Sequence, residues 1–149
     1  QLRLPVVTMT LRGTYLDTRN SLLSEWEKAA QHIRTRGYAV KVLRDTGTAL
    51  RMGSGFGELN LDLRMAEYQS ASMNLQANNG SASLCWFSEK PYVMFDAGVG
   101  DSAEEWRGLF VDQGLPLGSS WPWATPKQRI CYRQATADTI VEEFERGVG

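Results

Sequence analysis

Short apolar runs alternate with amphipathic stretches along most of the chain. Runs that are typical of β-strands occur at residues 6–11, 38–43, 71–77, 91–95 and 129–132. They are enriched in β-branched and aromatic residues, which favour the extended conformation. The first run is almost continuously apolar, as a strand buried on both faces of a parallel sheet is, and we therefore expect it to be the central strand.

Two long stretches have the 3.6-residue periodicity of amphipathic helices. The first is expected to begin after an N-cap at Asn20 or Ser21 and to end at Gly37, because glycine tolerates the left-handed conformation of a helix C-terminus. The second is expected to begin after an N-cap at Thr136. The apolar stripe of the first consists of Leu22, Leu23, Trp26, Ala29, Ala30 and Ile33, and that of the second consists of Ala137, Ile140, Val141 and Phe144.

Shorter helices are predicted between the later strands. Asp62 is expected to cap a short helix that leads into the third strand. Two more are expected at 81–86 and 101–110. The helix after Asp62 is expected to run through Leu63, Ala66 and Tyr68. In the last of the three, Trp106, Leu109 and Phe110 are expected to face inward.

The resulting order of elements, with strands and helices alternating throughout, predicts an α/β fold. It is expected to be a three-layer Rossmann-like sandwich with a mostly parallel five-stranded sheet, formed by a single domain over residues 1–149. Right-handed crossovers would place the loops after Leu11 and Ala77 beside each other. Ligands of doubly wound sheets bind at such a switch point, outside the carboxyl ends of the strands.

The turn after the third strand is the strongest candidate for a binding site. Asn78, Asn79 and Gly80 separate the strand from the helix that follows, so the helix N-terminus points its free N–H groups at the expected crevice, where they suit an anion. Gly80 allows a close approach of the ligand, and Ser81 or Ser83 adds a hydroxyl group. Asn-Gly is also a common turn dipeptide, so the turn alone does not require a ligand.

Two further segments are weaker candidates. Residues 53–57, Gly-Ser-Gly-Phe-Gly, resemble a dinucleotide fingerprint but lack its third glycine and follow the second strand instead of the first, so we expect a surface loop. Trp121 and Trp123 lie in a proline-rich segment, where they either stack on a sugar or base or pin the segment to the core; we favour the second interpretation.

Charge and cysteine usage exclude several classes of function. The chain has 16 Lys and Arg against 17 Asp and Glu, without a run of either sign, so we expect no nucleic-acid partner and no binding to a charged membrane surface. No apolar run is long enough to span a membrane. Cys85 and Cys131 lack the spacing of a metal site and are expected to be buried reduced thiols, which favours the cytoplasm. We expect neither a metal nor a cofactor.

The stretch from Ala66 to Phe95 resembles a motif of ADP-heptose lipopolysaccharide heptosyltransferases and related GT-B glycosyltransferases. In that family a T-N-D-[ST]-G-P-x-H-L segment meets the donor diphosphate, and here residues 78–84 read Asn-Asn-Gly-Ser-Ala-Ser-Leu. Asn78 or Asn79 stands in place of the acidic residue of the motif, and Ser83 occupies the histidine position. The stretch from Val6 to Asp45 is similar to the start of the nucleotide-sugar half of these enzymes.

The resemblance implies that the chain is the C-terminal Rossmann-like half of a glycosyltransferase that acts in surface carbohydrate synthesis. It implies a nucleotide-diphosphate sugar as donor, a carbohydrate acceptor, no metal, and an N-terminal Rossmann-like domain that supplies the catalytic base, so this chain alone is not expected to transfer sugar. Two alternatives remain open, a non-catalytic binding module and a small nucleotide-sugar epimerase or hydrolase. The expected substrate-binding residues are Asn78, Asn79, Gly80 and Ser81, with Arg12 and Arg19 either as charge partners of the diphosphate or as solvated surface residues.

Overall fold

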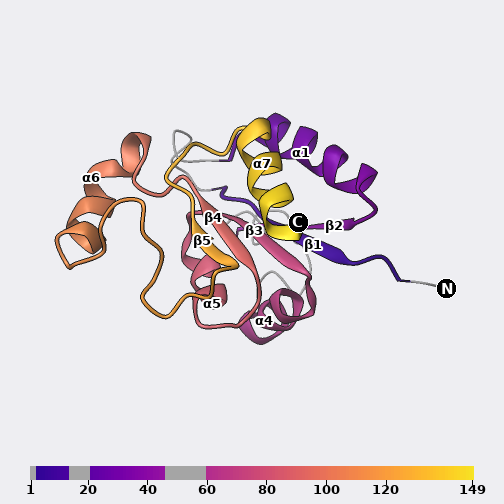
Figure 1. Cartoon of the computed structure of the whole chain (residues 1–149), viewed down its shortest axis with the longest axis horizontal. Helices are drawn as coiled ribbons and strands as arrows, with labels where there is room; N and C mark the ends of the chain where they lie inside the picture. The colour runs from indigo at the N-terminus through magenta and orange to yellow at the C-terminus, as the bar shows by residue number, and fades with distance from the viewer. Residues whose placement is uncertain (1–2, 14–20, 46–59) are drawn as a thin grey trace.

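The computed structural model describes residues 3–13, 21–45 and 60–149. Within them, five strands form one sheet in the order β2-β1-β3-β4-β5, and every neighbouring pair is parallel (Figure 1). The strands are β1 (Val6–Thr10), β2 (Ala39–Leu43), β3 (Met73–Ala77), β4 (Tyr92–Phe95) and β5 (Gln128–Ile130). The predicted five-stranded parallel sheet is therefore confirmed.

The position of the first strand differs from the prediction. β1 is paired on both sides, with β2 and β3, but the middle of the sheet is occupied by β3. All five residues of β3 are buried, including Asn74 and Gln76. A continuous apolar run shows that a strand lies inside a sheet but not at which interior position, and the two polar residues made β3 look less central than it is.

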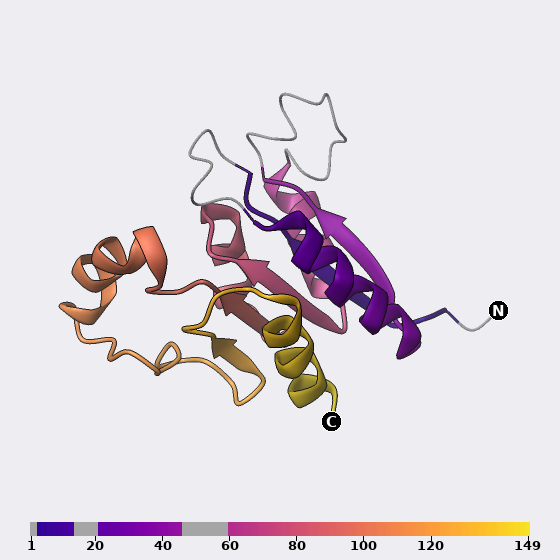
Figure 2. The ribbon, with the colours of Figure 1, turned by 90° about the horizontal axis from the view of Figure 1, so that it is seen from above.

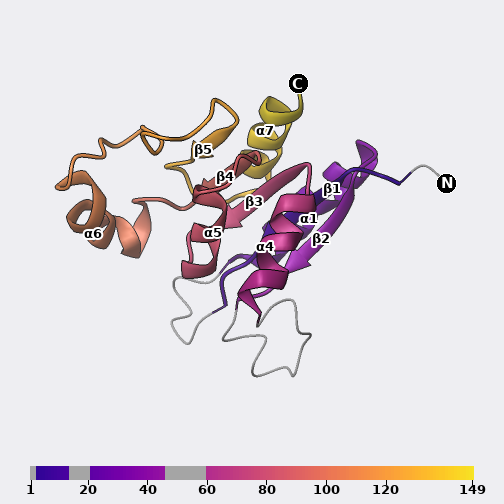
Figure 3. The same ribbon diagram turned by 90° about the horizontal axis from the view of Figure 1, so that it is seen from below.

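Helices cover both faces of the sheet and make three layers. Helices α1 (Leu23–Thr35) and α7 (Ala137–Val148) lie side by side on one face, as Figure 2 shows. Helices α4 (Leu61–Ser70) and α5 (Ser83–Trp86), with the 3-10 turn η2 (Gly80–Ala82), lie on the other face (Figure 3). This is the doubly wound arrangement with a switch point between β1 and β3.

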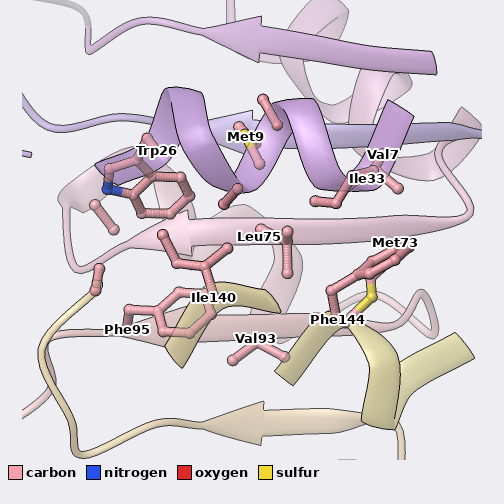
Figure 4. Packing of buried hydrophobic residues seen from close by; sticks show 14 of the residues in the cluster. Val7, Met9, Trp26, Ile33, Met73, Leu75, Val93, Phe95, Ile140 and Phe144 are labelled. Atoms are coloured by element: carbon pink, nitrogen blue, oxygen red, sulfur yellow. The ribbon is translucent and has the colours of Figure 1, made fainter. Parts of the chain in front are cut away.

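The larger core lies between the sheet and the pair α1 and α7 (Figure 4). The rings of Trp26 and Phe95 meet edge to face at a centroid distance of 5.8 Å, and Ile140 and Phe144 are fully buried in the same core. The Glu25 carboxylate accepts the Ala137 N–H at 2.9 Å, which links α1 to the first turn of α7. Burial and this hydrogen bond together fix the two helices against the sheet.

The buried stripe of α1 begins later in the helix than predicted. Leu22 and Leu23 are 51% and 66% exposed, so the buried stripe begins at Trp26. The N-cap position is Leu22, without a side-chain cap, because the Ser21 hydroxyl accepts the Arg12 N–H instead at 2.8 Å. Asn20 lies outside the described residues. The helix ends as predicted, with Gly37 at a φ of +85°.

Helix α4 also differs from its predicted pattern. Its N-cap is Asn60, whose side chain accepts the N–H groups of Asp62 and Leu63. Leu63 and Ala66 are exposed, and the inward face is made by Arg64 and Tyr68, both fully buried. The helix faces inward with polar groups because the sheet beneath it presents polar groups as well: the Thr10 hydroxyl lies 2.9 Å from the Tyr68 hydroxyl.

The segment after β4 lies beyond the carboxyl ends of the strands, at the left of Figure 1. It consists of η3 (Gly100–Ser102), α6 (Ala103–Trp106) and the π-helical turn η4 (Arg107–Val111), where one helix was predicted. Trp106 is buried, whereas Leu109 is 56% exposed. Trp106 belongs to a second, smaller buried cluster, and Trp121, which is 7% exposed, packs in it as predicted. Trp123 stacks on Trp121 while remaining 53% exposed.

Candidate functional site

The loops after β1 and β3 meet at the carboxyl edge of the sheet, as the predicted switch point requires. Arg12 follows β1, and its Nη1 donates to the Asn78 carbonyl oxygen at 2.7 Å. The side-chain amide nitrogen of Asn79, Nδ2, donates to the Leu11 carbonyl oxygen at 3.4 Å. The structure therefore brings the predicted residues Arg12, Asn78 and Asn79 together, although 66 residues separate Arg12 from Asn78 along the chain.

The turn after β3 is held by hydrogen bonds within itself. The Asn79 Oδ1 accepts the Ala82 N–H at 2.9 Å and the Ser81 hydroxyl at 3.0 Å, so Asn79 is the N-cap of η2. The Ser81 oxygen also accepts from the Arg64 Nη1 at 3.0 Å. The side chains of Asn79 and Ser81 therefore shape the turn, and what they leave for a ligand is mainly the turn's backbone.

Gly80 has the open surroundings expected of a residue that a ligand approaches closely. A Cβ atom built on Gly80 would meet no heavy atom within 4 Å, and Gly80 is not among the glycines with positive φ. Gly80 therefore contributes free space beside the turn and not an unusual backbone conformation.

Two adjoining hollows open at this edge of the sheet. The first has a volume of about 210 Å³ and a mixed lining, more polar than that of the second, whose polar residues include Asp96, Ser102 and Gln134. The second has a volume of about 260 Å³ and is lined by Gly80 and by aromatic side chains. The aromatic side chains of the second hollow are those of Trp86, Trp106 and Phe110. Arg12, Asn78 and Ser102 line both hollows, so the guanidinium lies where the two meet.

Asp96 is a site residue that the sequence analysis missed. It directly follows β4, lines the first hollow and has a φ of +61°, which makes it the one non-glycine residue with positive φ in the described part of the chain. Its Oδ1 accepts the Ala135 N–H at 2.8 Å. An acidic residue at the carboxyl end of a parallel strand was a usable signal, because that edge binds the ligands of such folds.

Burial raises the pKa of the Asp96 carboxyl above its ordinary value, and the Ala135 N–H and the charge of Arg12 offset only part of this. The native state therefore binds the proton more tightly than the unfolded chain does. It follows that the free energy of unfolding decreases as the pH rises through the window from the ordinary carboxyl pKa to the raised one. Above that window Asp96 is ionised in both states, and the native state bears the full free-energy cost of burying the charge.

Asp96→Asn is therefore expected to raise the Tm at about pH 7, and the gain should vanish below about pH 4, where the aspartate is protonated in both states. Asparagine keeps an acceptor for the Ala135 N–H and tolerates positive φ. Thermal denaturation of both proteins between these pH values measures the effect. A lower Tm for the variant at neutral pH would contradict it.

Arg64 supports the site from beneath. This fully buried side chain of α4 donates to the Ser81 hydroxyl and, at 3.4 Å, to the Tyr68 hydroxyl. Its other terminal nitrogen donates to the Arg44 carbonyl oxygen. One guanidinium thus joins α4, the end of β2 and the turn after β3, so the shape of the turn depends on an interior residue.

Part of the predicted site lies outside the described residues. This holds for Arg19 and for the glycine-rich stretch 53–57. Within the described residues Arg12 is the cation that lines the hollows, and it shares them with the carboxylates of Asp96, Asp101 and Glu105. The lining accordingly offers one positive position between groups that suit neutral, hydroxyl-bearing parts of a ligand.

The described ranges contain neither a candidate metal site nor a helix that could span a membrane. No three His, Cys, Asp or Glu side chains there are placed to hold a metal ion. None of the helices described is long and apolar enough to cross a bilayer. Both cysteines are free and buried, as predicted, and burial raises the pKa of the Cys85 thiol to about 12, so Cys85 is not a nucleophile at neutral pH.

No family model, no curated protein and no solved structure matches the chain.

Proposed function

We propose that the two adjoining hollows bind a nucleotide-diphosphate sugar and that the chain is the donor-binding half of a GT-B glycosyltransferase. The observation that carries this proposal is the position of Arg12. Its guanidinium is held by the Asn78 carbonyl at the junction of the β1 and β3 loops and lines both hollows. A fixed cation at the switch point of a doubly wound sheet suits a diphosphate, with further hydrogen bonds available from the turn at Gly80.

The size and lining of the hollows favour a ligand with two different ends. Each volume, about 210 and 260 Å³, is smaller than the ~300–1,000 Å³ of common ligand pockets, so a ligand that occupies both fits better than a compact one. The aromatic lining of the second hollow suits a nucleobase, because every base has a face that stacks on aromatic rings. The first hollow is the more polar of the two and suits the sugar.

The same arrangement provides part of the chemistry of sugar transfer. When an acceptor hydroxyl attacks the anomeric carbon, negative charge accumulates on the departing diphosphate, which Arg12 would stabilise. The base that deprotonates the acceptor is expected in the other half of the enzyme. The chain alone should therefore bind the donor without transferring sugar.

Gly80→Val tests the proposed phosphate contact at the turn. Gly80 lines the second hollow and a Cβ atom there would meet no heavy atom within 4 Å, so the valine variant should fold and bind nucleotide-sugars about tenfold more weakly. Asn79→Ala is the comparison: removing the N-cap should lower the free energy of unfolding by about 1 kcal/mol and weaken binding by less than Gly80→Val does.

The measurement is calorimetric titration with uridine, guanosine, adenosine and deoxythymidine diphosphate sugars, on variants shown by circular dichroism to be folded. A folded Gly80→Val protein that binds as tightly as the parent would remove the turn from the site. Turnover of a nucleotide-sugar by the chain alone would contradict the proposed division between two halves.

A further inference from the structure

The backbone of Asp96 is fixed from several sides. Its N–H donates to the Arg133 carbonyl at 3.2 Å, and its own carbonyl accepts the Ser102 hydroxyl at 3.3 Å. These bonds tie the residue to the segment after β5 and to η3, and they hold a positive φ that non-glycine residues rarely adopt. A strained backbone that its surroundings over-determine is common at ligand sites.

The Asp96 carboxylate is only partly used by the protein. Its Oδ1 accepts the Ala135 N–H, and among the described residues no other hydrogen bond is made to the carboxylate. Arg12, which lines the same hollow, acts on it as a nearby charge. The Oδ2 and the remaining lone pairs are therefore left for a ligand in the first hollow.

The chemistry of a carboxylate limits what that ligand part can be. An ionised carboxyl group only accepts hydrogen bonds, and its two oxygens can accept from two donors together. It repels phosphate, which places the anionic part of the ligand at Arg12 and a neutral donor group at Asp96. A vicinal diol presents two O–H donors on one side of a ring and fits this requirement.

We propose that Asp96 recognises a vicinal diol of the ligand, namely the 2,3-diol of the sugar whose diphosphate lies at Arg12. The inference rests on the proposed function and adds a specificity residue to it. A diol of this kind is present both in the donor sugar and in the ribose, and the first hollow, which Asp96 lines and which is the more polar of the two, assigns it to the sugar.

Two variants of Asp96 and one control test the proposal. Asp96→Asn keeps the shape and the Ala135 acceptor but removes the charge. Asp96→Gly removes the carboxylate and keeps a residue that tolerates positive φ. Asp112→Asn is the control, because Asp112 is an exposed carboxylate that lines neither hollow.

Calorimetry compares the nucleotide-sugar that binds tightest with its nucleoside diphosphate, its 2-deoxy-sugar analogue and its 2′,3′-dideoxyribose analogue. We expect the loss of the sugar's 2-hydroxyl to weaken binding to the parent and to Asp112→Asn about tenfold, and to change binding to both Asp96 variants less than twofold. The nucleoside diphosphate itself should bind the parent and Asp112→Asn alike, and the two Asp96 variants at least as tightly, because they lose a negative charge near Arg12.

The other possible outcomes separate the inference about Asp96 from the proposed function. If the dideoxyribose analogue shows this dependence on Asp96 instead, the diol is confirmed and belongs to the ribose. If neither analogue depends on Asp96 while the nucleoside diphosphate still binds, the inference is overturned and the proposed function stands. If no nucleoside diphosphate binds the parent protein, both are overturned.

Discussion

Arg12→Gln is expected to weaken the binding of a nucleotide-diphosphate sugar by about 10- to 150-fold. This range corresponds to the ~1.5–3 kcal/mol of a hydrogen bond to a charged group. Glutamine removes the positive charge at the junction of the two hollows, where Arg12 is otherwise held by the Asn78 carbonyl. Calorimetry at two salt concentrations measures the effect, and the affinity of the variant should depend less on salt than that of the parent.

Arg34→Gln is the matched control for this experiment. Arg34 is an exposed arginine of α1 that lines neither hollow, so its replacement changes the net charge equally and should leave the affinity within about twofold. Equal losses in the two variants would mean that the ligand senses only the overall charge. Unchanged binding in Arg12→Gln would remove the guanidinium from the site.

Arg64→Met is expected to lower the free energy of unfolding by about 2–4 kcal/mol. Methionine approximates the length of the side chain but donates no hydrogen bond, so the interior oxygens of Ser81, Tyr68 and Arg44 lose a donor. Each buried polar group left unsatisfied costs about 1–3 kcal/mol, and relaxation of the turn should recover part of the sum. Urea denaturation measures the change.

Arg34→Met serves as the control for stability, because an exposed helical arginine contributes little beyond its helix propensity. It should change the free energy of unfolding by less than about 0.5 kcal/mol. A similarly small change in Arg64→Met would show that the guanidinium does not support the turn after β3.

Periodicity predicted the parts of this fold that rest on apolar burial. The five strands and the parallel sheet followed from the apolar runs, and the meeting of the loops after β1 and β3 followed from the handedness of crossovers. The inward face of α7 and its Thr136 cap were also predicted correctly, because a regular stripe and a side-chain cap are local signals.

The sequence was less informative where polar groups are buried. Arg64, Asn74 and Gln76 lie in the interior, and some of the partners of Arg64 and Asn74 come from distant parts of the chain, as with the Thr8 hydroxyl that donates to the Asn74 Oδ1 at 2.6 Å. A rule that places apolar residues inside therefore did not identify the buried Arg64 of α4 and assigned the wrong centre to the sheet.

Some of the residues that line the candidate site were predicted from the sequence, and Asp96 was not. Arg12 and the turn at Asn79 were identified because a turn after a parallel strand has a known relation to ligands. The role of Asn79 as a cap became evident only from its contact with Ala82. Asp96 was overlooked because an aspartate before Ala-Gly is typical of a loop, and its approach to Arg12 depends on the tertiary fold.

The most direct test of the central claim is an NMR titration of the uniformly ¹⁵N-labelled chain with the nucleotide-sugar that binds tightest. If the hollows at the carboxyl edge are the binding site, the largest amide shifts should occur at Arg12, Asn78–Ser81, Asp96 and Gly100–Ser102. Residues at the amino ends of the strands, such as Val6 and Tyr92, should not respond. Shifts concentrated at that opposite edge, or no shifts at saturating ligand, would contradict the account.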